Sequence, residues 1–128
     1  MKEIKAYIRR DEVNEVVERL QRAGAPGVSV IEIHPVGYGY EASRFERHTA
    51  RFIDRYRYLA VVKLEIMCGN DQVDTLLEVV QSSCRTGNPG DGMLFVSDVL
   101  DAVRIRDGVR GEGALREGPS VAAAKPVA

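Results

Sequence analysis

Apolar and polar residues alternate near the start of the chain, and this pattern predicts a strand over residues 3–9. Successive side chains of a strand point to opposite faces, so three apolar residues share one face: Ile4, Ala6 and Ile8. The spacing then becomes helical between Asp11 and Gly24, with apolar residues three and four positions apart: Val13, Val16, Val17 and Leu20. Asp11 is the expected N-cap, because a carboxylate accepts hydrogen bonds from first-turn amides.

A second strand and helix repeat this pattern about sixty residues later, which indicates a duplicated unit. The helix sequences are DEVNEVVERLQ from Asp11 and DQVDTLLEVVQ from Asp71, and the second is expected to be capped by Asn70 or Asp71. Further strands are expected over residues 28–36, 58–67 and 93–96, with a short fifth strand over 102–106. The order predicts an α+β, ferredoxin-like double βαβ fold with a four-stranded antiparallel sheet and two helices. Because one sheet face lacks helices, we expect it to pack against other copies.

Composition fits one globular domain over residues 1–115, followed by a disordered tail over 116–128. The chain has 128 residues, of which 45% are hydrophobic and 29% charged, and its net charge is -1. This charge argues against a nucleic-acid partner, which would require a surplus of Lys and Arg. No signal-like or membrane-spanning apolar run is present, so a cytoplasmic location is expected. Cys68 and Cys84 form no CxxC pair, so we predict buried thiols and no metal site.

Three segments stand apart from the sheet and helices. Residues 37–57 form too long a connection for a hairpin and carry five arginines: Arg44, Arg47, Arg51, Arg55 and Arg57. The stretch CRTGNPGDGMLFV, residues 84–96, holds three glycines, whose exposed amides are typical of anion sites but also of awkward turns. Arg104 and Arg106 would share one side of the fifth strand, as a phosphate clamp or as surface charges.

Together these segments resemble the PII family of signal-transduction proteins. The resemblance rests on KEIKAYIR, AGAPGVSVIE, RTGNPGDGMLFV and DAVRIRDGVRGEGAL, and covers the chain to about Leu115. It implies a homotrimer with an adenine nucleotide (ADP, AMP or ATP) in each cleft between subunits. Residues 37–57 would be the effector-responsive T-loop, which contacts a partner protein or a membrane transporter. Residues 85–92 would be the nucleotide-binding B-loop.

The resemblance also implies site residues. Those expected to bind the nucleotide are Ser29, Gly37, Glu65, Ile66, Met67, Gly90, Asp91, Gly92, Met93, Arg104 and Arg106. Ser29 would bond the base, main-chain groups at 65–67 would frame it, and Asp91 would mainly fix the turn. A small anion would bind at the base of the T-loop: Gly37, Tyr38, Gly39 and Tyr40. No catalytic or metal-ligating residue is implied.

Several residues depart from the family pattern. Met93 and Asn88 stand where lysines are common, and fewer cations near the phosphates favour ADP or AMP over ATP. Gly39 replaces the glutamine used with magnesium and 2-oxoglutarate, and Val61 replaces the lysine that pairs with that keto acid. We therefore expect inorganic-carbon regulation with bicarbonate as the second ligand, and the alternatives are standard nitrogen regulation and pairing with a transporter.

Two other classes of function fit the sequence less well. A ferredoxin-fold phosphohydrolase would need a nucleophile, a base and an orienting group close together, and no such set is recognisable. An RNA-recognition domain would need aromatic residues on its central strands, and LAVVKLEIM has none. The sequence therefore predicts a regulatory protein without enzymatic activity.

Overall fold

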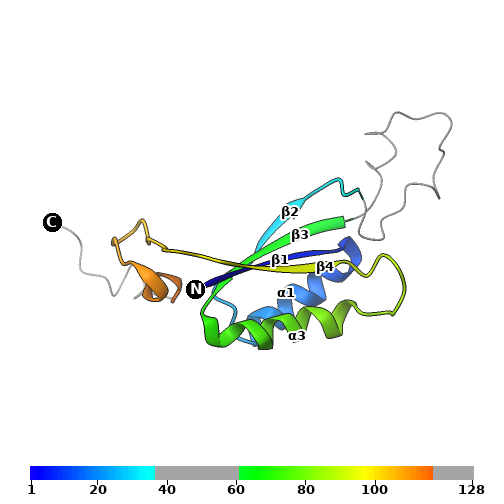
Figure 1. Cartoon of the computed structure of the whole chain (residues 1–128), viewed down its shortest axis with the longest axis horizontal. Helices are drawn as coiled ribbons and strands as arrows, with labels where there is room; N and C mark the ends of the chain where they lie inside the picture. Colours follow the sequence, from blue (N-terminus) through cyan, green and yellow to red (C-terminus); the bar gives the residue numbers. More distant parts are fainter. Residues whose placement is uncertain (37–60, 117–128) are drawn as a thin grey trace.

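The computed structural model describes residues 1–36 and 61–116, which form a four-stranded sheet and two helices (Figure 1). The first half contains β1 (Lys2–Arg9), η1 (Arg10–Glu12), α1 (Val13–Arg22) and β2 (Ser29–Glu32). The second half contains β3 (Val61–Cys68), η3 (Asn70–Gln72), α3 (Val73–Cys84), β4 (Met93–Asp98) and η4 (Gly111–Leu115). The strand order is β2-β3-β1-β4, and every pairing is antiparallel. The predicted α+β double βαβ fold is confirmed.

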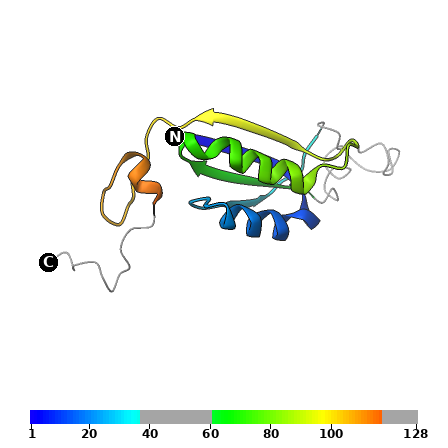
Figure 2. The ribbon, with the colours of Figure 1, turned by 90° about the horizontal axis from the view of Figure 1, so that it is seen from below.

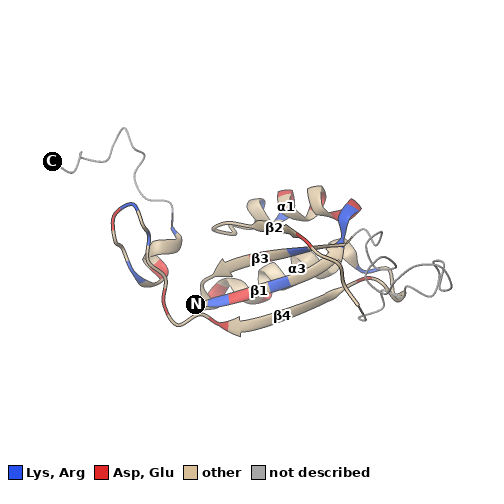
Figure 3. Ribbon diagram, turned by 90° about the horizontal axis from the view of Figure 1, so that it is seen from above, with Lys and Arg blue, Asp and Glu red and all other residues tan. Residues whose placement is uncertain are grey.

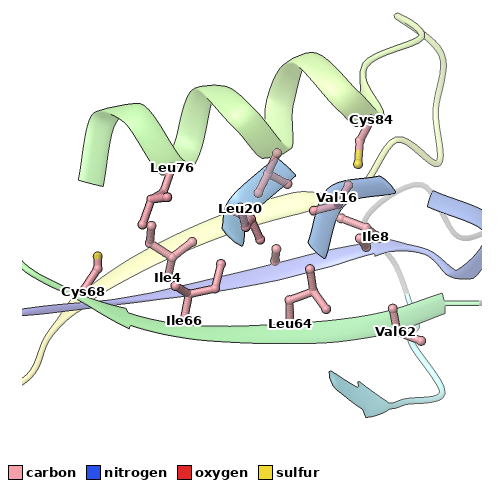
Figure 4. Close-up of a cluster of buried hydrophobic side chains, with 12 residues drawn as sticks. Ile4, Ile8, Val16, Leu20, Val62, Leu64, Ile66, Cys68, Leu76 and Cys84 are labelled. Carbon is pink, nitrogen blue, oxygen red and sulfur yellow. The ribbon is translucent and has the colours of Figure 1, made fainter. Parts of the chain in front are cut away.

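Both helices cover the same face of the sheet, and the core lies between them (Figure 2). The alternation in β1 sends Ile4, Ala6 and Ile8 into this core, where Ala6 lies opposite Leu64 of β3. The helices contribute core residues at helical spacing: Val16, Leu20, Leu76 and Val80. Figure 4 shows Val16, Leu20 and Leu76 pointing at the strands. Burial of each Leu or Val stabilises the fold by about 1.5–3 kcal/mol relative to exposure. Cys68 and Cys84 are buried free thiols, as expected.

The opposite sheet face is covered by neither helix and mixes apolar with charged residues (Figure 3). Ile31 of β2 and Phe95 of β4 are exposed there. The Phe95 ring meets Tyr7 edge-on, with centroids 5.7 Å apart. On β3, Lys63 Nζ lies 2.7 Å from Glu65 Oε1. This face therefore combines a paired lysine and glutamate with exposed apolar side chains such as Ile31.

Two expected elements differ from the structure. The second strand ends at Glu32 rather than at residue 36, ahead of Pro35, which has no N–H to donate to a ladder. A fifth strand over 102–106 is absent from the described residues. The chain instead turns back after Arg104, at Asp107 and Gly108, and a single bridge joins Val103 to Arg110. Gly108 allows this turn with a φ of 74°.

The expected helix caps are also wrong. Asp11 lies inside η1 and Asp71 lies inside η3, and neither they nor Asn70 occupy the cap position. Gly69 takes that position in η3, and its amide donates to Gln72 Oε1 at 3.1 Å. The short 3-10 turns before each helix shift the cap by a few residues, which local composition does not reveal.

Two predicted segments fall largely outside the described residues. The T-loop prediction, 37–57, and all but the first residue of the tail prediction, 116–128, concern positions of which the structure gives no description. In the part that is described, no helix is long and apolar enough to cross a membrane.

Candidate functional site

The glycine-rich loop between α3 and β4 needs its glycines for backbone conformation. Gly87, Gly90 and Gly92 have φ values of 86°, 98° and 109°. Residues with a Cβ rarely adopt this left-handed region. The loop therefore turns sharply three times within residues 85–92, and its amides carry little side-chain cover.

Asp91 holds this loop together from inside, as expected for a residue that fixes the turn. Its carboxylate accepts hydrogen bonds from the amides of Thr86, at 2.8 Å, and Gly87, at 2.9 Å, and from the Thr86 hydroxyl. These bonds lower the pKa of Asp91, with Thr86 as the main cause and the Arg9 guanidinium as a further one. The Asp91 carboxylate is thus occupied by donors of its own loop. Other N–H groups of the loop remain to bind an anion.

Acidification should loosen the loop through Asp91. Its folded-state pKa lies below its ordinary value, so the contribution of the ionised group to stability is complete above about pH 4 and is lost as the pH falls below it. Urea unfolding of the wild type should lose more stability between pH 6 and pH 3 than unfolding of Asp91→Asn does. Equal losses in the two proteins would contradict this role of the carboxylate.

A pocket of about 430 Å³ lies near the start of β2, toward the end of the sheet that is away from the glycine loop. Three predicted residues line it, and Ser29 is directly opposite Glu65 in the β2–β3 pairing, with Met67 two residues further along β3. Ile66, which was also predicted, is buried in the core and does not line this pocket. Sequence reasoning missed Ala114 and Leu115, which complete the wall; they lie in the GEGAL motif but were assigned no role.

The glycine loop and the arginine segment lie at opposite ends of the sheet (Figure 1, Figure 3). Met93, which follows the loop, pairs with Tyr7, whereas Asp98 pairs with Lys2. Strands rise about 3.3 Å per residue, so the length of β4 alone separates the two segments by about 17 Å. One chain therefore does not bring Gly90 and Arg106 to the same small molecule.

The two arginines of the predicted clamp differ in their surroundings. Arg104 is only 16% exposed, and its guanidinium donates to the carbonyls of Gly113, at 2.6 Å, and Arg116, at 2.9 Å. It also donates to the Asp107 carboxylate at 2.8 Å. Arg106 is 43% exposed and lies 4.0 Å from that carboxylate. Arg104 therefore fastens the C-terminal turn, and Arg106 presents its charge outward.

Comparison with known proteins decides the family. The family model described as "Nitrogen regulatory protein P-II" matches residues 1–109, which include the glycine loop and both arginines. The chain belongs to this family.

The P-II chain has relatives in several organisms, of which three are described next. It is 38% identical over 115 residues to "Nitrogen regulatory protein P-II" of Cereibacter sphaeroides, covering 90% of this chain and all of the relative. It is also 38% identical over 115 residues to "Nitrogen regulatory protein P-II 2" of Methanothermobacter thermautotrophicus, covering 90% and 97%. A P-II homolog of Arabidopsis thaliana is 34% identical over 111 residues, covering 87% of this chain and 56% of the relative. The chain is a P-II regulatory protein.

The remaining predicted positions of this P-II protein divide into two groups. Gly37, Tyr38, Gly39 and Tyr40 lie outside the described residues. Met93 is partly exposed at the start of β4, next to the glycine loop, and Val61 is buried, with 2% of its surface exposed. Among residues 1–36 and 61–116, no group of acidic, His or Cys side chains could hold a metal ion.

Proposed function

We propose that this P-II protein binds an adenine nucleotide in clefts shared between the subunits of a homotrimer, and that residues 37–57 pass its nucleotide state to a partner protein. The observation that carries this proposal is the separation, within one chain, of the glycine loop from the pocket near Ser29 and from Arg106. A second copy can supply the missing half. The helix-free sheet face, with Ile31 and Phe95 exposed, supports such association.

The proposed site divides the nucleotide between its two halves. The pocket near Ser29 has polar groups from Ser29 and Glu65 beside apolar Met67 and Leu115, which suits a base and its edge. Amides of Gly90, Asp91 and Gly92 would meet the phosphates, since Asp91 directs its carboxylate at Thr86 and Gly87.

The charge near the phosphates favours ADP or AMP over ATP. Met93 and Asn88 supply no cation in this loop, and the guanidinium of Arg9 is already paired, 3.1 Å from Asp91 and 3.6 Å from Glu12. Each further negative charge on the phosphates would therefore be neutralised less completely by nearby cations than it would be with lysines in the loop. Arg85 of the loop and Arg106 of the neighbouring copy are the cations left for the phosphates.

Titration calorimetry with ADP, on a sample whose mass is measured by sedimentation, tests the proposal. We expect one ADP per chain, tighter binding than for ATP, and a mass about three times the 14.1 kDa of one chain. Three chains allow each glycine loop to meet a neighbour's Arg106. A monomer that binds ADP at full stoichiometry would contradict the shared cleft, and an oligomer that binds no adenine nucleotide would contradict the ligand.

For the second ligand, we propose bicarbonate rather than 2-oxoglutarate, and hence a role in inorganic-carbon metabolism. Val61 is apolar and buried, so it offers no cation to a dicarboxylate. A small anion would need only a few donors near residues 37–40. The curated relatives carry nitrogen-regulatory names, so nitrogen regulation through 2-oxoglutarate is the competing outcome of the same measurement. The partner would be an acidic protein or a transporter, because residues 37–57 carry five arginines.

A further inference from the structure

A single side chain fastens both ends of the glycine loop. Arg9, the last residue of β1, donates from its guanidinium to the carbonyl of Cys84 at 3.1 Å and to the carbonyl of Gly90 at 3.2 Å. The same group donates to Asp91 Oδ1 at 3.1 Å. Cys84 is the last residue of α3, and Gly90 and Asp91 come just before β4. Arg9 thus bridges the start and the end of the loop.

Packing beneath the loop is incomplete, so these hydrogen bonds carry much of its order. A cavity of about 350 Å³ lies there, bounded mainly by apolar side chains from β1, α3 and β4: Ile8, Val80, Cys84, Met93 and Leu94. The loop cannot rest on a filled core at this point. The Cys84 carbonyl is also one of those that a helix leaves without an internal partner at its C-terminus. Arg9 provides that partner.

The bond to Gly90 also orients the neighbouring amide. Because the peptide group is planar, a Gly90 carbonyl that points at Arg9 directs the Asp91 N–H to the opposite side. No described residue accepts a hydrogen bond from the Gly90 or Asp91 amide. The hydrogen bonds of the protein itself therefore turn the Asp91 amide away from Arg9.

We propose that Arg9 is a positioning residue that sets the glycine loop in its phosphate-binding shape before the nucleotide arrives. This inference rests on the nucleotide site proposed above. Asp91 and Glu12 both lie against the guanidinium, so its charge is largely compensated within the protein. Its effect on binding is then geometric. A guanidinium reaches several acceptors from one plane, whereas an ammonium is a compact charge without this fork.

The test compares Arg9→Lys with the matched control Arg10→Lys. Arg10 is the adjacent residue, and among residues 1–36 and 61–116 its guanidinium bonds to the exposed Glu32 across the protein surface. Hydrogen exchange of residues 85–92 is measured without nucleotide, and binding of ADP and of adenosine is measured by calorimetry. We expect Arg9→Lys to speed exchange in the loop by about tenfold or more. It should also weaken ADP about tenfold while adenosine changes by less than about twofold, and Arg10→Lys should match the wild type in both.

The two binding measurements separate positioning from general damage. If Arg9→Lys acted only by lowering the stability of the fold, its affinities for ADP and for adenosine would fall together. Arg9→Met would then resemble Arg9→Lys in thermal melting alone. Wild-type ADP affinity in Arg9→Lys, combined with a loss in Arg9→Met, would show that charge alone matters and would overturn the inference. If the wild type binds no adenine nucleotide, the proposed function fails. In that case the exchange measurement still decides whether Arg9 holds the loop, and unchanged exchange in Arg9→Lys would overturn this as well.

Discussion

2-Oxoglutarate should bind the wild-type protein about a thousandfold more weakly than it binds a Gly39→Gln/Val61→Lys double variant. The resemblance to P-II proteins implies that glutamine at the first position serves the magnesium and that lysine at the second pairs with a carboxylate. Each lost interaction is worth about 2–4 kcal/mol, so the pair exceeds the roughly 4 kcal/mol of a thousandfold change. The measurement is calorimetric titration of 2-oxoglutarate in the presence of magnesium and ATP.

Val61 is buried, so the double variant needs a control for damage to the fold. The Val61→Met variant keeps the site apolar and should bind 2-oxoglutarate as poorly as the wild type, with similar thermal stability. Bicarbonate, in contrast, should change the ADP affinity of the wild type, and by reciprocal coupling ADP should change the affinity for bicarbonate. Tight, magnesium-ATP-dependent binding of 2-oxoglutarate by the wild type would contradict this prediction and support nitrogen sensing as the function.

The second large effect concerns the arginine segment. Arg106→Ala should weaken ADP binding by about 1.5–3 kcal/mol, the cost of a charge-assisted hydrogen bond, and leave the fold unchanged. Within the described part of the chain, the ion pair of Arg106 is a long one of 4.0 Å to Asp107, so little structure depends on it. Arg104→Ala should weaken ADP binding and also destabilise the C-terminal turn, because Arg104 holds the Gly113 and Arg116 carbonyls. Calorimetry and thermal melting together distinguish the two variants.

Mixed assemblies test whether Arg106 acts on a neighbouring copy. Arg106→Ala is co-refolded with Gly90→Val, which should spoil the glycine loop because Gly90 has a φ of 98°. In a shared cleft, about a quarter of the sites in an equal, random mixture would have both parts intact and bind ADP normally. If both parts of each site came from the same chain, mixing would restore none. If the unmixed Arg106→Ala variant bound ADP with normal affinity, the phosphates would lie away from Arg106.

The sequence predicted the sheet and helices well because their signals are local. The alternation of Ile4, Ala6 and Ile8 and the helical spacing of Leu76 and Val80 each reflect which face is buried. The fifth strand was wrong although Arg104 and Arg106 alternate there. Asp107 and Gly108 turn the chain back, and the single bridge from Val103 to Arg110 replaces a ladder.

The nucleotide-binding residues remain a prediction, but the structure shows which of them lie close together. Ser29, Glu65 and Met67 line one pocket, because β2 pairs with β3. The unequal roles of Arg104 and Arg106 could not be predicted, since they depend on carbonyls nine to twelve residues further along the chain. Leu115 was missed as a wall of the pocket for the same reason.

By itself, the sequence determined the order of the four strands and two helices, the family, and the positions where glycine is required by the backbone. Only the tertiary structure decided that Arg9, a residue with no distinguishing neighbours in the sequence, spans the glycine loop through contacts 75 to 82 residues away. It also decided that this loop and Arg106 lie at opposite ends of one sheet. Periodicity records which side of an element is buried, whereas the meeting of distant residues depends on strand pairing and register, which local patterns do not encode.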